Sequence, residues 1–382
     1  MTYVKSLSPI DKIKAEAFNL GFLLCGVSNP DVPISDYGIY NSWINNGYHH
    51  SLKYLSSERA LSIRKDPKSL LSNCRSIISL GIPYPHPTPH DSSKSGKISS
   101  YAWNLDYHDV IIRLVDQFMD RISPYIGNDI NWKAYTDTGP ILERSFAQKA
   151  GLGWIGKNSM LISPKFGSHF FLAEILLDKK IEALNKPGNI DYCGICHNCI
   201  DACPTQCILP DRTIDTKKCI SYLTIENKEE IPIYLRKMIG NWVFGCDICQ
   251  NVCPWNKKDS TKTHVIDDFK FRKEIAFPDL LEDIHLTQDQ FSKKFKNSPI
   301  KRAKRRGYLR NVAVAIGNSS NNEALPHLIE VMAKEKDSLI KRHVAWALGQ
   351  IGGKDIYSYL REILNQENDP YIISEIKSVL NT

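Results

Sequence analysis

The most informative segment of this sequence is residues 191–204, which read Asp191-Tyr192-Cys193-Gly194-Ile195-Cys196-His197-Asn198-Cys199-Ile200-Asp201-Ala202-Cys203-Pro204. Its cysteines follow the spacing C-x2-C-x2-C-x3-C-P, in which three thiolates hold one iron-sulfur cluster and the fourth, ahead of the proline, binds a second cluster. The later part of this spacing recurs further along the chain, in Cys246, Cys249, Cys253 and Pro254. Two 4Fe-4S clusters in one module are therefore predicted.

The second motif lacks its first cysteine, because Val243 stands at that position, and Cys219 is the best placed of the remaining cysteines to replace it. If each cluster takes its fourth ligand from the other motif, two ligand sets follow, namely Cys193, Cys196, Cys199 and Cys253 for the first cluster and Cys203, Cys219, Cys246 and Cys249 for the second. A pair of structural zinc sites remains the alternative, although the triplet spacing has no purpose around a tetrahedral ion. Three cysteines are left over, and we expect Cys25 and Cys74 to be buried and Cys207 to be a bystander.

The composition is that of an ordinary globular protein. The 382 residues suffice for two or three domains, and 42% hydrophobic with 24% charged residues exclude wholesale disorder and fibrous or membrane classes. The N-terminal residues contain no signal-peptide core, and no apolar run is long enough to span a bilayer. We therefore expect a cytoplasmic protein with reduced thiols, whose clustered cysteines bind metal rather than form disulfides.

Three regions of the chain differ in their residue composition and hydrophobic pattern. Residues 1–185 predict a mixed α/β domain, residues 186–262 are short cysteine-rich segments, and residues 263–382 are helical. In the last region, Arg310–Gly317 aligns with Arg342–Gly349 at an offset of 32 residues. A period near 32 with two amphipathic helices per unit indicates HEAT-type stacking, although two similar helical hairpins in a bundle would have nearly the same shape.

A glycine motif, Gly151-Leu152-Gly153-Trp154-Ile155-Gly156, satisfies G-x-G-x-x-G and, with Lys157, partly imitates a phosphate-binding loop. Both nucleotide-binding motifs need a strand before the glycines and a helix after them. Here a helix is predicted before them, over 140–150, and a strand after them, over 160–163. We therefore expect no nucleotide site at these glycines.

The segment Asp137-Thr138-Gly139-Pro140 lies between a predicted strand and a predicted helix, where α/β folds present ligand-binding groups. An ordinary helix N-cap role for Asp137 is equally compatible with this position.

Taken together, these motifs closely resemble the epoxyqueuosine reductase family. Besides the cysteine pattern, the resemblance is carried by four stretches: Asp137-Thr138-Gly139-Pro140-Ile141-Leu142-Glu143-Arg144, Gly151 to Asn158, Cys219-Ile220-Ser221-Tyr222-Leu223-Thr224 and Gly245-Cys246-Asp247-Ile248-Cys249-Gln250. That family uses cobalamin and two 4Fe-4S clusters to reduce epoxyqueuosine at the wobble position of tRNA, the last step of queuosine biosynthesis. The resemblance implies an α/β cobalamin-binding catalytic domain over 1–185, a bacterial ferredoxin-like 4Fe-4S module over 186–262 and an all-α HEAT-like tRNA-binding domain over 263–382.

The resemblance also implies roles for single residues. Asp137 matches the family's proton donor, and the positions that match residues near the cobalamin are Arg64, Asp137, Asn158, Leu161, Leu172, Lys228 and Asp247. Each of these other than Asp137 could instead be an ordinary surface or core residue. The D-x-H-x-x-G motif that supplies a histidine ligand in some cobalamin proteins is absent, so the resemblance implies a cofactor without one.

The tRNA would bind to a segment that we call the basic segment, residues 293–310, which holds nine positive charges and no acidic residue. These nine charges exceed the formal net charge of +7 for the whole chain, so the remainder is nearly neutral. The contacts that we expect are Lys293, Lys294, Lys301, Arg302, Lys304, Arg305 and Arg306. A merely solvated face is the alternative for this segment.

Two other functions remain open from the sequence. A corrinoid reductase of a small molecule, like the related reductive dehalogenases, would share the cofactors but gives no reason for a basic helical domain. An electron-transfer protein with a nucleic-acid-binding module would need no cobalamin. In every case we expect a monomer with no membrane contact that takes its electrons from an external donor.

Overall fold

The structure is a computed structural model that describes residues 8–86, 95–182, 191–257 and 265–381. The chain divides into two compact units, the first formed by Met1–His86, Leu105–Thr216 and Ile248–Lys270, the second by Pro87–Asn104, Lys217–Asp247 and Phe271–Thr382. The predicted domain boundaries at 185/186 and 262/263 fall in 183–190 and 258–264, outside the described residues. Residues of the cysteine-rich region belong to both units.

The first unit contains a four-stranded sheet in the order β1-β2-β7-β4, with β1 at Leu24–Ser28, β2 at Ser76–Pro83, β7 at Phe170–Leu177 and β4 at Trp132–Tyr135. Strands β2 and β7 pair along their whole length, from Ser76 opposite Leu177 to Pro83 opposite Phe170. All three pairings are antiparallel, so this sheet lacks the parallel crossovers of doubly wound α/β folds. Both β1 and β2 are buried throughout, as their apolar sequences predict.

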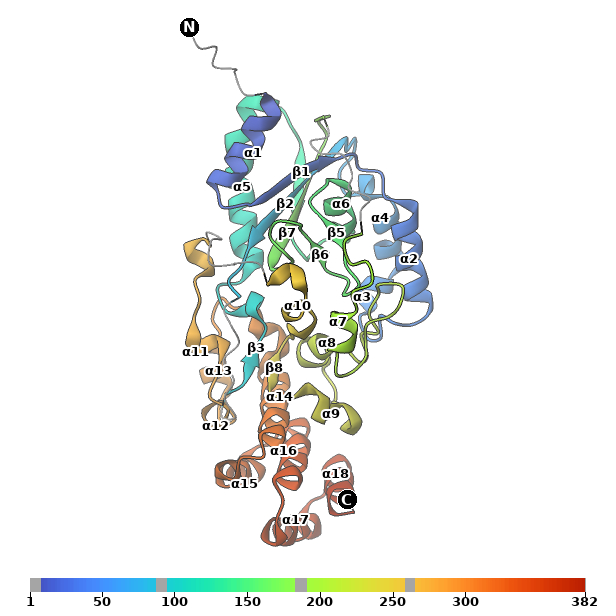
Figure 1. Cartoon of the computed structure of the whole chain (residues 1–382). Helices are drawn as coiled ribbons and strands as arrows, with labels where there is room; N and C mark the ends of the chain where they lie inside the picture. Colours follow the sequence, from blue (N-terminus) through green and yellow to red (C-terminus); the bar gives the residue numbers. More distant parts are fainter. Residues whose placement is uncertain (1–7, 87–94, 183–190, 258–264, 382) are drawn as a thin grey trace. The chain divides into compact units, whose positions relative to one another are not determined.

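Helices cover both faces of this sheet, with α1 and α5 on one side and α2, α4 and α6 on the other (Figure 1). The helices of this unit are α1 Pro9–Asn19, α2 Ile34–Asn45, α3 Lys53–Ser56, α4 Glu58–Lys65, α5 Tyr107–Ile126, α6 Glu143–Lys149, α7 Asn198–Asp201 and α10 Ile248–Asn251. The long helix α5 begins at its cap Asp106 and buries an apolar stripe at helical spacing, for example Ile111, Val115 and Phe118. A short antiparallel pair, β5 Trp154–Ile155 and β6 Leu161–Ile162, follows α6.

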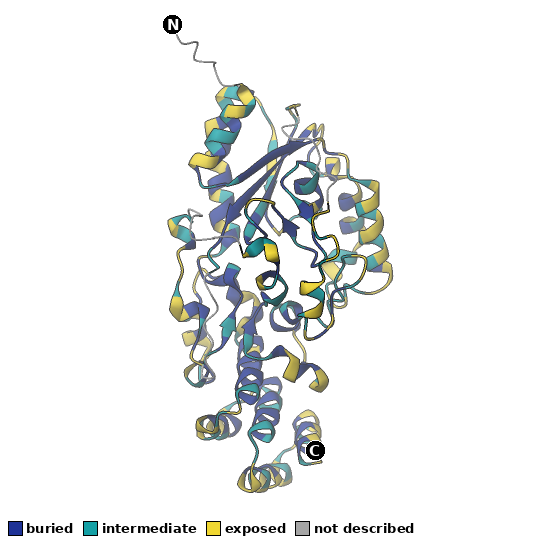
Figure 2. Cartoon of the chain, in the orientation of Figure 1, coloured by how far each residue is buried: buried dark blue, intermediate teal, exposed yellow. Residues whose placement is uncertain are grey.

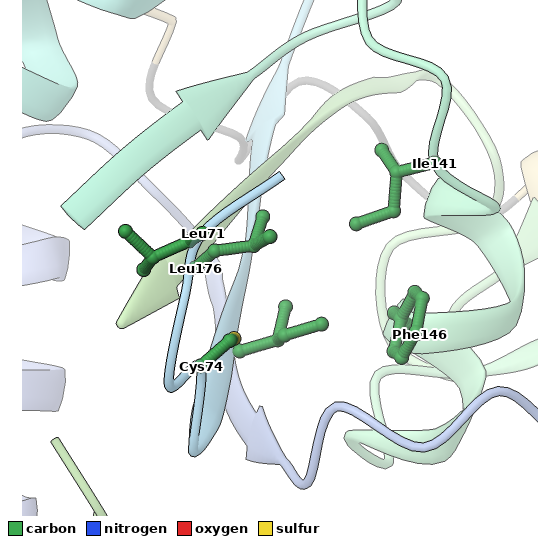
Figure 3. Close-up of a cluster of buried hydrophobic side chains, with 6 residues drawn as sticks. Leu71, Cys74, Ile141, Phe146 and Leu176 are labelled. Carbon is green, nitrogen blue, oxygen red and sulfur yellow. The ribbon is translucent and has the colours of Figure 1, made fainter. Parts of the chain in front are cut away.

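One hydrophobic cluster joins the sheet to α6 and contains Leu71, Cys74, Ile141, Phe146 and Leu176 (Figure 3). Ile141 anchors the turn between β4 and α6 in this core. Cys74 is 5% exposed and so is Cys25 in β1, which confirms that both are buried core residues. Burial raises the pKa of the Cys25 thiol to about 12, so it stays protonated and unreactive.

The second unit is mostly helical and includes a short parallel pair, β3 Lys97–Ile98 with β8 Trp242–Phe244. Its helices are α8 Ile220–Ile225, α9 Ile233–Ile239, α11 Lys273–Ala276, α12 Leu280–Asp283, α13 Gln288–Lys294, α14 Lys304–Ser319, α15 Leu325–Lys334, α16 Ser338–Ile351, α17 Lys354–Gln366 and α18 Pro370–Leu380. The two aligned sequence repeats lie in α14 and α16, which pack together and form the buried centre of this unit (Figure 2). Among the described residues, no helix is both long enough and apolar enough to cross a bilayer.

Candidate functional site

Asp137 lies on a tight turn after β4, where its backbone has the left-handed φ of 57°. Its side chain is 70% exposed, and its backbone N–H donates a hydrogen bond of 2.7 Å to Glu143 Oε1. Helix α6 begins at Glu143 with Leu142 at the cap position, so the alternative of an N-cap role for Asp137 is wrong. Thr136 Oγ1 donates to the Leu172 carbonyl at 2.7 Å and ties the start of the turn to β7. The turn therefore presents a carboxyl group from a firmly held backbone.

Residues at the start of α5 surround this carboxyl group. The Tyr107 hydroxyl donates to Asp137 Oδ2 at 2.6 Å, and His108 Nε2 lies 3.9 Å from the same oxygen. His108 Nδ1 is 2.7 Å from Asp106 Oδ1, so the imidazole is held between two carboxylates. Burial raises the pKa of Asp106, but hydrogen bonds from the ring and backbone of His108 outweigh that effect and lower it.

Two further carboxyl groups, those of Glu143 and Glu174, belong to the elements next to this turn. Desolvation raises the pKa of Glu143 to about 8, and the Asp137 charge adds to this rise, whereas Arg144 and Arg64 oppose it. Glu174, in the middle of β7, is fully buried and accepts a 2.5 Å hydrogen bond from Ser79 Oγ. Burial raises the pKa of Glu174 well above its ordinary value. Burial therefore favours the protonated form of both glutamates.

The sequence did not identify Tyr107, His108, Glu143 or Glu174 as site residues. A signal existed for Glu174, because it is the one charged residue in the apolar run of β7. For Tyr107 and His108 the sequence has no signal, because 30 residues separate Tyr107 from Asp137.

Four predicted cofactor residues of the first unit are buried or packed. Arg64 is 8% exposed and its guanidinium lies over the Tyr40 ring. Leu161 and Leu172 belong to one hydrophobic cluster next to α6. Asn158 is 2% exposed, and its amide is engaged with the Cys249 carbonyl at 3.4 Å and the Met160 N–H at 3.2 Å. The structure thus brings Leu161 and Leu172 together and uses Asn158 as a structural hydrogen-bonding residue.

The other two predicted cofactor residues, Lys228 and Asp247, belong to the second unit. Lys228 Nζ donates to the carbonyls of Ile225 at 2.7 Å and Arg302 at 2.9 Å, and burial lowers its pKa. Asp247 is 4% exposed and accepts hydrogen bonds from the Ser99 hydroxyl and, at 2.7 Å, the Ser100 N–H. Asp247 is therefore held rigidly by the segment that precedes α5.

The four cysteines predicted for the first cluster line a single cavity of about 230 Å³ in the first unit, together with Lys157, Asn158, Ile162, Tyr192, Asn198, Pro254 and Trp255. Cys253 thus reaches the same space as Cys193, Cys196 and Cys199, which lie far from it in sequence. Trp154 Nε1 donates a hydrogen bond of 3.4 Å to Cys193 Sγ.

The four cysteines predicted for the second cluster belong to different parts of the chain. Cys203 and Cys249 are in the first unit, whereas Cys219 and Cys246 are in the second. Cys207 is 4% exposed, and its sulfur lies 3.5 Å from Cys203 Sγ. The hydrogen bond from Cys207 is the main reason why the pKa of the Cys203 thiol falls to about 5, which favours the thiolate form that binds metal.

The basic segment is less uniform than its sequence indicates. Arg310 is fully buried and donates to backbone carbonyls of Leu223, Asn227 and Glu229, so it is a structural residue. The two aromatic residues of the segment, Phe295 and Tyr308, are also fully buried. They pack in the core and cannot stack on bases.

Ion pairs neutralise four of the seven predicted tRNA contacts, namely Lys294 with Asp283, Arg302 with Glu226, Arg305 with Glu335 and Arg306 with Asp337. The remaining exposed cations are Lys293, Lys296, Lys301 and Lys304, for which the described residues provide no carboxylate partner within 4.0 Å. These four lysines carry the positive charge that is available to a ligand.

Known protein families are similar to three parts of this chain. Three family models match it: "Epoxyqueuosine reductase QueG, DUF1730" over residues 64–138, "4Fe-4S double cluster binding domain" over 192–256 and "HEAT repeats" over 303–381. The chain is similar to the epoxyqueuosine reductase of Cyclobacterium marinum, with 39% identity over 80% of this chain and 97% of the relative. It is similar to that of Escherichia coli K12, with 35% identity over 88% of each.

Solved structures are similar over nearly the full length. An epoxyqueuosine reductase bound to an epoxyqueuosine-modified tRNA-Tyr stem loop has a TM-score of 0.89 and 30% identity, and the match covers 97% of both chains. The Bacillus subtilis enzyme, solved with a catalytic aspartate loop swung out of its active site, has a TM-score of 0.88 and 29% identity over 97% of this chain and 98% of that one.

Proposed function

This chain belongs to the epoxyqueuosine reductase family, and we propose that it reduces epoxyqueuosine to queuosine at the wobble position of tRNA with Asp137 as the proton donor. The observation that carries the role of Asp137 is its geometry: an exposed carboxyl group on a left-handed turn, with one oxygen held by the Tyr107 hydroxyl at 2.6 Å. We further propose that the enzyme works in the cytoplasm, where thiols stay reduced.

The reaction converts an epoxide to an alkene, which removes the oxygen as water and consumes two electrons and two protons. When bound, cobalamin and the two 4Fe-4S clusters supply the reducing chemistry. Asp137 donates a proton to the departing oxygen, while Tyr107 fixes the orientation of the carboxyl group. His108 Nε2, at 3.9 Å, is close enough for one bridging water to return a proton to Asp137.

We propose that Asp247 and its neighbours bind amide groups of the cobalamin. Ser100 and Asn104 are each 2% exposed, and among the described residues neither the Ser100 hydroxyl nor either amide atom of Asn104 has a hydrogen-bond partner. Unsatisfied buried polar atoms are rare in folded proteins and point to a missing ligand. Ser100 lies directly against Asp247, so a polar cofactor at this place fits the residues present.

We propose the ligand sets predicted from the spacing for the two clusters. The shared cavity of Cys193, Cys196, Cys199 and Cys253 supports the first set, because four thiolates around one space are what a 4Fe-4S cluster requires. Arg64, Asn158, Leu161, Leu172 and Lys228 stay candidates for the walls of the cofactor site.

Lys293, Lys301 and Lys304, joined by Lys296, are the proposed phosphate contacts, since they are exposed and have no ion-pair partner among the described residues. We propose weaker contributions from Lys294, Arg302, Arg305 and Arg306, whose charges are balanced within the protein. A reductive dehalogenase-like reductase of a small molecule would have no use for these lysines.

The test is anaerobic incubation of the reconstituted enzyme with epoxyqueuosine-containing tRNA, followed by mass analysis of the nucleosides. We expect queuosine from the wild type and none from Asp137→Asn, because the amide cannot donate an acidic proton. The variant should keep its cobalamin and tRNA affinity. Normal turnover by Asp137→Asn would exclude this role, and a wild type that leaves epoxyqueuosine unchanged would overturn the proposed function.

A further inference from the structure

Helix α6 precedes the glycine motif of residues 151–158, strand β5 lies within it and strand β6 follows it. This is not the strand–glycine–helix order that a nucleotide-binding loop needs. Its glycines serve close packing instead. A Cβ atom on Gly153 would lie 2.1 Å from the Ile162 carbonyl oxygen, so only glycine allows the β5–β6 turn to close. The motif also carries Trp154 and Lys157, whose side chains this close packing does not require.

Both side chains are directed at the first cluster site. Lys157 lines the same cavity as the four cysteines, and its Nζ donates to the Gly194 carbonyl at 2.8 Å and to the Cys196 carbonyl at 3.0 Å. The ammonium group thus caps the loop that carries the ligands. Trp154 is 3% exposed and donates its indole N–H to Cys193 Sγ at 3.4 Å. Tyr192 and Trp255 pack around its ring and fix its position.

From this geometry we propose that Lys157 and Trp154 raise the reduction potential of the first 4Fe-4S cluster. Lys157 would act through its contacts with the ligand loop and Trp154 through its hydrogen bond to Cys193 Sγ. The inference rests on the proposed assignment of Cys193, Cys196, Cys199 and Cys253 as its ligands. Both residues act as positioning residues, because they contact the ligand loop and one ligand sulfur rather than the substrate.

The physical reason is electrostatic. Reduction adds one electron to a cluster that its four thiolates already make negative, and a fixed cation nearby stabilises the added charge. A hydrogen bond to a ligand sulfur withdraws electron density and acts in the same direction. The apolar side chains of Ile162 and Trp255 also line this cavity, so solvent screens these interactions only in part.

The experiment is a potentiometric titration, monitored by electron paramagnetic resonance, of the full chain carrying both clusters, without cobalamin and without tRNA. We expect Lys157→Met to move one of the two cluster reductions to a more negative potential by at least a tenfold change in the ratio of oxidised to reduced cluster, which is about 59 mV for a one-electron couple. Trp154→Phe should shift the same reduction in the same direction by less. Lys157→Arg should retain most of the wild-type potential.

The matched control is Lys53→Met, which removes the same charge from an exposed position on α3. Unchanged potentials in a Lys157→Met protein with full iron content would overturn the proposal. If Lys157→Met loses iron, Trp154→Phe decides, and an unchanged potential there refutes the proposal. A wild-type chain that binds no iron would overturn the ligand assignment and this inference with it. None of these results depends on reductase activity.

Discussion

The Asp137 residue is held by contacts with side chains from two helices. Tyr107 and His108 come from the start of α5, and Glu143 comes from the start of α6. The exposed Asp137 carboxyl is therefore supported by a layer of side chains from two helices, in which Tyr107 is buried and His108 and Glu143 are half-buried. Glu143 is the member of that layer whose protonation can be measured.

Glu143→Gln tests the protonation state of this half-buried carboxyl group. Its pKa is about 8 in the folded protein against 4.5 ordinarily, so folding favours the protonated form. The contribution of Glu143 to stability is complete below the lower value and is lost as pH rises toward the upper one. We expect the variant to gain stability relative to the wild type as the pH rises from about 5 to about 8, by up to about 3 kcal/mol.

Urea unfolding of both proteins at each pH measures this difference. The amide of the variant can still accept the hydrogen bond from the Asp137 N–H, so the turn is preserved. Glu182→Gln, at an exposed position of the same unit, is the control and should produce a difference that does not change with pH. A pH-independent difference for Glu143→Gln as well would show that Glu143 is ionised.

Among the elements, helix α14 combines two roles. Its first turn carries exposed charges of the basic segment, and its remaining length forms buried packing with α16. The change from exposed to buried positions within α14 divides its positive charges into the exposed Lys304, the ion-paired Arg305 and Arg306, and the buried Arg310. Burial of Arg310 is the clearest case.

The four unpaired lysines should dominate the salt dependence of tRNA binding. Replacing Lys293, Lys296, Lys301 and Lys304 with alanine should reduce the magnitude of the slope of log affinity against log salt by about 3, since each phosphate contact contributes about 0.7 to 0.9. Fluorescence anisotropy with a labelled anticodon stem loop over a range of KCl concentrations measures it. Arg306→Ala, which removes a cation paired with Asp337, should change the slope much less. An unchanged slope in the lysine variant would place the tRNA elsewhere.

Close helix packing in the repeat depends on a small residue at position 349. A Cβ atom on Gly349 would lie 2.2 Å from Cγ1 of Val379, so Gly349→Ala should force α16 and α18 apart and cost about 1 to 3 kcal/mol. Gly307→Ala is the matched control, because its Cβ atom would meet only Ala303 at 3.9 Å. We expect that control to be neutral or to stabilise by up to about 1 kcal/mol. Equal melting temperatures for the two variants would contradict this view.

For the whole molecule, the proposed iron-sulfur ligands come from segments that are distant from one another in the sequence. Cys253 completes the cavity of the first three cysteines, and we expect Cys253→Ser to lose half of the iron and all turnover while tRNA affinity is kept. Cys207→Ser, outside both ligand sets, should retain the full iron content. Iron and acid-labile sulfide analysis of the purified variants distinguishes these outcomes. Full iron in Cys253→Ser would exclude it as a ligand.

The sequence alone was sufficient for everything that depends on short spacing or repetition. The cysteine spacing indicated the double-cluster module, the offset of 32 residues indicated paired helices, and the segment around Asp137 indicated the family. Covalent spacing sets these features, so they can be read without a fold.

Only the tertiary structure decided what depends on burial and on contacts between distant segments. It showed that the sheet is antiparallel, that ion pairs balance four of the nine positive charges of the basic segment, and that burial raises the pKa of Glu143 and of Glu174. It also showed that Trp154 and Lys157 of the glycine motif contact the loop that carries Cys193 and Cys196. The physical reason is that a side chain's charge, hydrogen bonds and pKa are set by its neighbours in space, which the local sequence does not specify.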